Sequence, residues 1–350
     1  MMITWLATMK KNVVRLAFIF LLTLVFLYFF SKNVHWKDAV RYLSNVNLPL
    51  FILLIAITPI HLLSRAIRWM FLLRHEKKGV KFYNAFAGNA VGFTVTMIFP
   101  GRLGELIKPL YLARKENMKT GFVIGTVVVE RIFDMFTMCF LLGVFLLAKP
   151  LYASSLKAGE GAFANLYRWG FVGLGFASFL ALFSAALYIF KEKMLRVIAF
   201  FLKPFPQKIS VKILELFREF SEGLRFFTSL RDVLIYALLS QMVWLSIIFY
   251  YWLFFISFRS PISYFFLFPY VFLTMVGASI PTPGMIGGFH AFSRLGLTTL
   301  FGMDPNMAWG LTIVVHLVQL VMTCLLGYAI LWKEGVTLFQ LKKLGENAQT

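Results

Sequence analysis

Charged side chains are scarce in this chain of 350 residues. Asp, Glu, Lys and Arg together make up 14% of the sequence, whereas hydrophobic residues make up 60% and phenylalanine alone occurs 41 times. Soluble domains carry about a quarter of charged residues, so this composition excludes a water-soluble enzyme or binding domain as the main body of the chain. The sequence instead predicts an all-α polytopic membrane protein, with residues 1–350 as a single transmembrane domain.

Cysteines and ligand motifs are also few. The only two cysteines, Cys139 and Cys324, fall inside apolar runs, which indicates neither a disulfide framework nor a metal site. The sequence has no Asp-rich metal motif, no His and Asp at ligand spacing and no nucleotide-binding loop. We therefore expect no metal, no cofactor and no enzymatic activity. No small-residue cleavage site follows the first apolar run, 13–30, which is predicted to be a retained anchor.

Acidic residues are the scarcest charged class, with 15 Asp and Glu against 35 Lys and Arg, for a net charge of +20. Such a charge suits either nucleic acid or an anionic membrane surface. Because so little of the chain is left for a soluble surface, the sequence favours contact with anionic lipid headgroups and predicts no nucleic-acid partner.

Eight apolar segments are present, and two of them are unusual. The third and the seventh are short, and each leads into a Pro-Gly pair followed by semi-apolar sequence. Eight plain crossings would also place neighbouring basic runs on opposite sides of the membrane, against the usual cytoplasmic bias of Lys and Arg. The eight segments are 13–30, 48–73, 83–99, 121–148, 169–190, 232–258, 264–280 and 307–332.

Treating 83–112 and 264–300 as re-entrant hairpins removes this conflict. Six full crossings then remain, and both termini are cytoplasmic. The cytoplasmic segments carry 24 Lys and Arg residues and the external ones carry seven. The cytoplasmic segments are 1–15, 64–81, 113–120, 191–231 and 332–350, and the external ones are 31–47, 149–168, 259 and 301–306.

The same assignment predicts an inverted repeat, with halves 1–148 and 165–335. Each half has the order crossing, crossing, hairpin, crossing, and three crossings turn the second half over. The two hairpin tips share the pattern P-G-x-(L/I)-G-x-(L/F), and Gly/Pro-interrupted segments at matching places in two halves indicate a transporter's binding site. The pattern residues are Pro100, Gly101 and Gly104 in the first half and Pro283, Gly284 and Gly287 in the second. Between the halves, 191–231 is predicted to be a cytoplasmic amphipathic connector with an interfacial helix over 209–227.

Charges lie where the membrane interior is expected. The first tip carries Arg102, Glu105 and Lys108, and the following crossing carries Glu130, Arg131 and Asp134. One such charge at mid-membrane costs about 2.5 to 3.5 kcal/mol, so these side chains must be paired or face a cavity. A local Arg131–Asp134 pair is available, which leaves Glu130 for Arg102 or Lys108. A structural clamp and a phosphate-binding gate both fit this pattern.

Weaker polar stripes occur on other crossings. One combines Thr58 and His61 with Arg65 and Arg68, and a second follows the last crossing. Each stripe could line a cavity. We expect His290 and Arg294, four residues apart after the second tip, to lie across from the first hairpin. The second stripe consists of Thr312, His316, Gln319 and Thr323.

Four motifs resemble the flippase-like family that includes the membrane domain of bacterial lysylphosphatidylglycerol synthases. They are "SRAIRW", "PGRLGELIKP", "ERIFD" and "PTPGMIGG", and the resemblance extends over essentially the whole chain. It implies movement of lipids or lipid-linked sugars between leaflets. One departure is His290, which stands about where many relatives have an acidic residue. The resemblance implies a candidate functional set of Arg102, Glu105, Glu130, Arg131 and Asp134.

Together these features favour a lipid translocator of the cytoplasmic (inner) membrane. Its cargo would be an anionic phospholipid or a lipid-linked sugar phosphate, because cations outnumber carboxylates around the expected cavity. An integral membrane transferase acting on headgroups and a non-transporting partner of an envelope-lipid pathway remain the alternatives. The sequence does not define the oligomeric state.

Overall fold

The chain is helical in the part described by a computed structural model, which covers residues 44, 46–99, 102–152, 159–204, 206–224, 229–280 and 282–335. The all-α prediction is therefore confirmed for these residues. The predicted first crossing at 13–30, both predicted cytoplasmic termini and the tip residues Pro100 and Gly101 lie outside them.

The first half supplies five helices to the described part of the chain. Asn47 caps the first of them through its side chain, and Pro59 marks the break before the second, as expected for a residue that cannot donate to the preceding turn. The helices are α3 (Leu48–Ile57), α4 (Ile60–Leu73), α5 (Phe82–Ile98), α6 (Gly104–Glu116) and α7 (Thr120–Leu147).

The second half follows after a short helix, α8 (Lys149–Tyr152). Its last helix begins at a proline whose preceding residue, Asp304, accepts hydrogen bonds from two backbone N–H groups. The elements are α9 (Glu160–Ile189), α10 (Lys191–Phe201), α11 (Gln207–Gly223), α12 (Leu230–Ser257), η2 (Tyr264–Phe266), α13 (Leu267–Ser279), η3 (Pro283–Met285), α14 (Gly288–Phe301) and α15 (Pro305–Lys333).

Four segments of the described chain are long and apolar enough to cross a membrane: 48–73, 161–189, 230–257 and 305–333. They match four of the predicted crossings. The crossing predicted at 121–148 forms α7, which is 28 residues long and carries the three charges of the "ERIFD" motif. The architecture is that of a polytopic membrane protein.

The two predicted hairpins form helix pairs, α5 with α6 and α13 with α14. Helices α6, α13 and α14 have 13 or 14 residues each, which is about 20 Å and too short to cross a hydrocarbon core alone. Glycines bring each pair together. A Cβ at Gly104 would lie 1.8 Å from the Gly92 carbonyl oxygen, and one at Gly288 would lie 2.2 Å from that of Gly277.

The two hairpin tips share one feature of backbone conformation. Arg102 and Met285 occupy the same position of the shared motif, and both are non-glycine residues in the left-handed region, with φ of 54° and 56°. Asn117 and Gly302 then end the second helix of each hairpin, again with left-handed φ. The two tips therefore share this left-handed conformation at one motif position, whereas the next motif glycines differ: Gly287 has a φ of 98°, and Gly104 is the first residue of α6.

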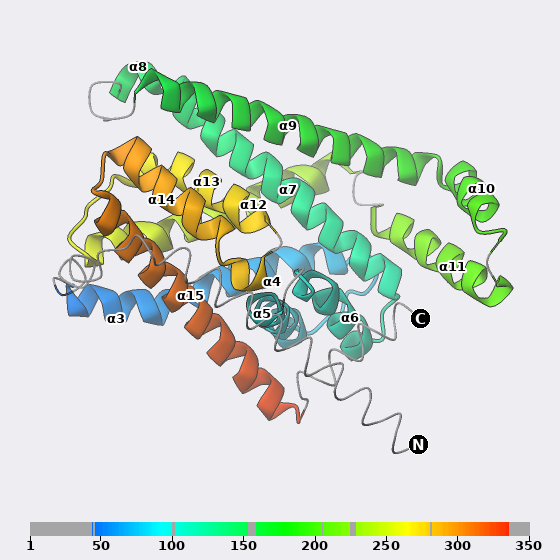
Figure 1. Cartoon of the computed structure of the whole chain (residues 1–350). Helices are drawn as coiled ribbons and strands as arrows, with labels where there is room; N and C mark the ends of the chain where they lie inside the picture. Colours follow the sequence, from blue (N-terminus) through cyan, green and yellow to red (C-terminus); the bar gives the residue numbers. More distant parts are fainter. Residues whose placement is uncertain are drawn as a thin grey trace, which may run out of the picture.

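Packing between the halves is reciprocal (Figure 1). Helix α5 of the first hairpin packs on α15 of the second half, and α13 of the second hairpin packs on α7 of the first half. Helices α4 and α12, which occupy matching places in the two halves, pack on one another. This exchange of contacts is the pattern that a pseudo-two-fold relationship produces, and it joins the halves into one unit.

The connector 191–231 forms α10 and α11 beside the long α9, at one side of the molecule (Figure 1). Helix α11 lies against the start of α7, where Gly121 and Gly125 allow close approach: a Cβ at Gly125 would lie 2.7 Å from the Phe220 carbonyl oxygen. The Glu219 carboxylate also accepts a hydrogen bond from the Gly121 N–H. The connector is thus anchored to the first half.

Candidate functional site

Three buried charges from two helices form the centre of the site. Glu130 and Asp134 lie one turn apart on α7 and face α4, where Arg68 is fully buried. The Arg68 Nη1 atom lies 2.6 Å from Asp134 Oδ1, and its Nη2 atom lies 3.4 Å from Glu130 Oε1. One guanidinium group therefore bridges both carboxylates.

Lys108 of α6 joins this centre from the first hairpin. Its ammonium group pairs with the other oxygen of Glu130 and lies 4.1 Å from the centre of the Trp69 ring. The sequence leaves Arg102 or Lys108 as the partner of Glu130, and in the structure the partner is Lys108. Lys108, Glu130 and Arg68 form a clamp, the α6–α7–α4 clamp, that holds the first hairpin to its neighbours.

The remaining first-half charges form a second layer. Arg131 Nη1 lies 3.3 Å from Asp134 Oδ2, the local pair that the sequence predicts, and Arg65 Nη1 lies 3.7 Å from the same oxygen. Arg102 pairs within the tip with Glu105 at 3.0 Å, and Arg131 Nε lies 4.0 Å from that carboxylate. Asp134 is consequently shared among three arginines.

Helix α12 completes the coordination of Asp134 and Arg68. Trp244 Nε1 donates to Asp134 Oδ1 over 3.0 Å, Arg68 Nη1 donates to the Ser240 hydroxyl over 3.2 Å, and Arg68 lies over the Tyr236 ring. Sequence reasoning missed these three residues. Their positions in an apolar helix give no signal of which face meets a charged neighbour.

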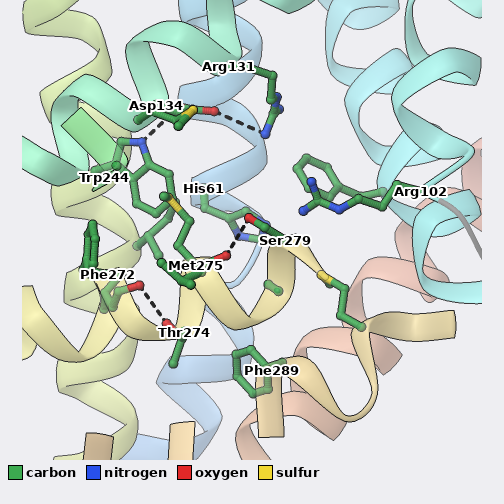
Figure 2. A pocket seen from close by; sticks show the side chains of 18 of the residues that line it. His61, Arg102, Arg131, Asp134, Trp244, Phe272, Thr274, Met275, Ser279 and Phe289 are labelled. Carbon is green, nitrogen blue, oxygen red and sulfur yellow. Dashed lines mark hydrogen bonds and ion pairs between the residues drawn. The ribbon is translucent and has the colours of Figure 1, made fainter. Parts of the chain in front are cut away.

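A pocket of about 630 Å³ adjoins the second layer of charges. In Figure 2, Arg102 reaches toward it from the tip before α6 and Arg131 from α7, and Trp244, Phe272 and Met275 line it elsewhere. Most of the wall is aromatic or aliphatic, so the pocket is charged in one region and apolar in the rest. Its polar lining residues include Arg65, Arg102, Glu105, Arg131, Asp134, His61, Gln319 and Thr323.

The pocket divides the predicted site residues into two groups. Arg65, Arg102, Glu105, Arg131 and Asp134 line it. Lys108, Glu130 and Arg68 are buried behind them and form the clamp. Both hypotheses raised by the sequence, a clamp and a cavity-facing charge set, thus correspond to different residues of one network.

The second tip contributes apolar side chains. Met285 and Phe289 line the pocket, and a Cβ at Gly284 would lie 3.0 Å from the Met97 carbonyl oxygen of α5, so the two hairpins touch. His290 does not line the pocket; its Nε2 atom lies 3.3 Å from Nδ1 of His316. Arg294 lies over the Trp309 ring at 5.3 Å, also away from the pocket lining.

The remaining tip residues lie at the starts of helices, and some of the stripe residues reach the pocket. Gly104 begins α6, Pro283 begins η3, and Gly287 precedes α14 with a φ of 98° that glycine adopts readily. From the two polar stripes, His61, Arg65, Gln319 and Thr323 reach the pocket.

Within the described ranges, no three His, Cys, Asp or Glu residues lie close enough together to hold a metal ion, and Cys139 and Cys324 are free thiols.

Long apolar helices, two short hairpins and a charged pocket between the halves define a multi-pass integral membrane protein. A family model described as the lysylphosphatidylglycerol synthase TM region matches residues 12–327, and the chain belongs to this family. It is also similar to a UPF0104 membrane protein of Methanocaldococcus jannaschii, at 23% identity over 91% of this chain and 95% of the relative. No solved structure matches the chain.

Proposed function

We propose that the protein translocates an anionic phospholipid or a lipid-linked sugar phosphate between membrane leaflets. The observation that carries this proposal is the pocket, which combines three arginines in one region with an apolar wall in the rest. An anionic headgroup needs positive charge and hydrogen-bond donors, while acyl chains need apolar surface. The family name also refers to the membrane region of a lipid synthase, which supports a lipid as the ligand.

In this proposal the two layers of charge have different roles. Each charge of the α6–α7–α4 clamp, Lys108, Glu130 and Arg68, is buried and has an ion-pair partner, so the clamp fixes the hairpin in place. Arg102 and Arg131 are partly exposed to the pocket and share Glu105 at 3.0 and 4.0 Å. A headgroup phosphate would compete with Glu105 for these two arginines, which makes that contact the part that opens during the cycle.

We further propose that the hairpins are re-entrant and that the halves are inverted in the cytoplasmic membrane. The short hairpin helices, the reciprocal packing of the halves and the excess of Lys and Arg in the segments assigned to the cytoplasm support this arrangement. The tips then meet inside the membrane, where irregular backbone is tolerated because it lines a cavity.

Leaflet exchange in liposomes tests the proposal. The full-length chain would be reconstituted with trace fluorescent phosphatidylglycerol, and dithionite added outside would bleach the outer leaflet. We expect the protein to make the inner-leaflet lipid accessible. Arg102→Ala should slow this exchange by about tenfold, the loss of about 1.4 kcal/mol of headgroup interaction.

Arg114→Ala is the matched control, because Arg114 is an exposed arginine at the far end of α6, the helix that follows Arg102. It should exchange lipid like the unaltered protein. Failure to accelerate exchange of phosphatidylglycerol, phosphatidate and a polyprenyl-phosphate sugar would contradict translocation. Lipid mass spectrometry after incubation with headgroup donors tests the transferase alternative, and we expect no new covalent product.

A further inference from the structure

The charge network contains more cations than carboxylates. Seven ion-pair contacts link its members into one chain that runs from Lys108 to Arg102. No other acid is paired with these cations among the described residues. The members are the five cations Arg65, Arg68, Arg102, Lys108 and Arg131 and the three carboxylates Glu105, Glu130 and Asp134.

The excess can be assigned to two positions. Glu130 contacts Lys108, Asp134 makes its shortest contact with Arg68, and Glu105 makes its shortest contact with Arg102. Arg65 and Arg131 are left without a carboxylate of their own, because both share an oxygen of Asp134 at 3.7 and 3.3 Å. His61, which also lines the pocket beside Arg65, adds no negative charge in either protonation state.

Both surplus arginines line the pocket and have unused donors. The Nε atoms of Arg65 and Arg131 are buried and have no hydrogen-bond partner within the described structure, as is also true of Arg68 and Arg102. Arg65 is 7% exposed, so bulk water compensates it poorly and its charge strongly favours a bound anion. A guanidinium group offers a planar set of donors that fits phosphate oxygens in pairs.

We infer that the pocket selects a headgroup that carries two negative charges on one phosphorus, a lipid phosphomonoester, over a phosphodiester lipid with a single charge. This inference rests on the proposed function, in that it takes the pocket as the headgroup site. Two surplus arginines and one dianion neutralise each other, whereas a phosphodiester leaves one positive charge uncompensated.

Binding to the detergent-solubilised full-length chain tests the inference directly. Titration calorimetry would compare short-chain phosphatidate, short-chain phosphatidylglycerol and inorganic phosphate at about pH 8, above the second pKa of a phosphomonoester near 6. We expect phosphatidate to bind about tenfold more tightly than phosphatidylglycerol, a difference of about 1.4 kcal/mol. Inorganic phosphate should bind more weakly than phosphatidate, because it lacks the apolar contacts.

Charge variants sharpen the test. Arg131→Gln lowers the surplus to one charge and should abolish the preference for phosphatidate, while Arg131→Lys keeps the charge and should retain it. Glu105→Gln raises the surplus and should strengthen the preference. Arg114→Gln should leave the preference unchanged, because Arg114 is exposed outside the network.

Two results would overturn the inference: equal affinity for phosphatidate and phosphatidylglycerol, or inorganic phosphate binding as tightly as phosphatidate. These results are separable from failure of the proposed function. Rapid exchange of both lipids with equal affinities would leave translocation standing and remove the headgroup preference. Preferential binding of phosphatidate without any leaflet exchange would do the reverse.

Discussion

Arg68 Nη1 lies 2.6 Å from Asp134 Oδ1, and neither side chain is exposed to solvent by more than a few per cent. The same guanidinium group reaches Glu130 from its other nitrogen. Because both carboxylates are on α7 and the arginine is on α4, this single side chain fixes the rotation of one helix against the other. It also gives two buried acids a shared positive partner, without which their burial would be costly.

Replacing Arg68 should therefore destabilise the fold strongly. Arg68→Met leaves Glu130 and Asp134 without their shared partner, and we expect a loss of at least about 3 kcal/mol in the free energy of unfolding. Unfolding in detergent, followed by circular dichroism against denaturant, measures this. Arg68→Lys should have a free energy of unfolding between those of the unaltered chain and Arg68→Met, because an ammonium group cannot contact both acids in a planar arrangement. A variant as stable as the unaltered chain would show that the bridge contributes little.

The glycine contact between α5 and α6 makes a second prediction. Gly104→Ala places a methyl group 1.8 Å from a backbone oxygen and should force the hairpin helices apart. We expect clear destabilisation, measured as a lower midpoint of thermal unfolding. Gly143→Ala is the control, because a Cβ there meets nothing within 4 Å and alanine is favoured over glycine in a helix by about 1 kcal/mol. Equal effects of the two substitutions would contradict close packing at Gly104.

Glu116 gives a prediction about pH at the end of α6, outside the predicted membrane segments. Its carboxylate accepts hydrogen bonds from Lys77 at 2.8 Å, Asn84 at 2.6 Å and the Lys81 backbone N–H at 3.0 Å. Burial raises the pKa of Glu116, but these three donors outweigh it and hold the pKa below its ordinary value. The stabilisation is therefore complete above the unfolded pKa near 4.3 and is lost as the pH falls through the lower folded pKa.

Glu116→Gln should accordingly cost about 1 to 2 kcal/mol of unfolding free energy at neutral pH, with a difference that shrinks as the pH falls below about 4. Unfolding curves of both proteins across this range measure the effect. Glu215→Gln, at an exposed position of α11, should match the unaltered chain throughout. A difference that is constant with pH would show that Glu116 does not act through its charge.

The proposed orientation in the membrane can be tested with two cysteines. In a background without Cys139 and Cys324, Thr299→Cys should react with an impermeant maleimide from outside intact cells. Arg114→Cys should react only after permeabilisation, because the first hairpin is proposed to return to the cytoplasmic side. Both positions are exposed in the fold, so accessibility to the reagent depends on the membrane. Labelling of Arg114→Cys from outside would rule out the re-entrant topology.

Local features of the site follow from the sequence, and contacts between helices do not. Helical spacing places Arg131 beside Asp134, and the structure shows that pair. Apolar length and the Pro-Gly pairs predict the two helix pairs α5–α6 and α13–α14, and those elements are present. By contrast, the position of Arg68 between both acids depends on how α4 rotates against α7, which no periodicity records.

The same limit applies to the second half. The spacing of His290 and Arg294 correctly places them on one face of a helix, but it does not tell which neighbour that face meets. In the fold, His290 contacts His316 and Arg294 lies over Trp309. The hydrogen bond from Trp244 of α12 to Asp134 could not be predicted either. A tryptophan in an apolar crossing can face lipid, another apolar helix or a polar group, and the sequence does not distinguish these environments.

Arg102 and Met285 share a left-handed backbone conformation although their side chains differ in chemistry. One tip presents a guanidinium group and the other a thioether, yet both side chains start from the same left-handed backbone conformation. This position of the motif therefore carries a charged or an apolar side chain in the same backbone conformation. Met285→Arg would present a cation from the opposite tip without remodelling the backbone, which offers a direct way to convert this lopsided pocket into a symmetric one.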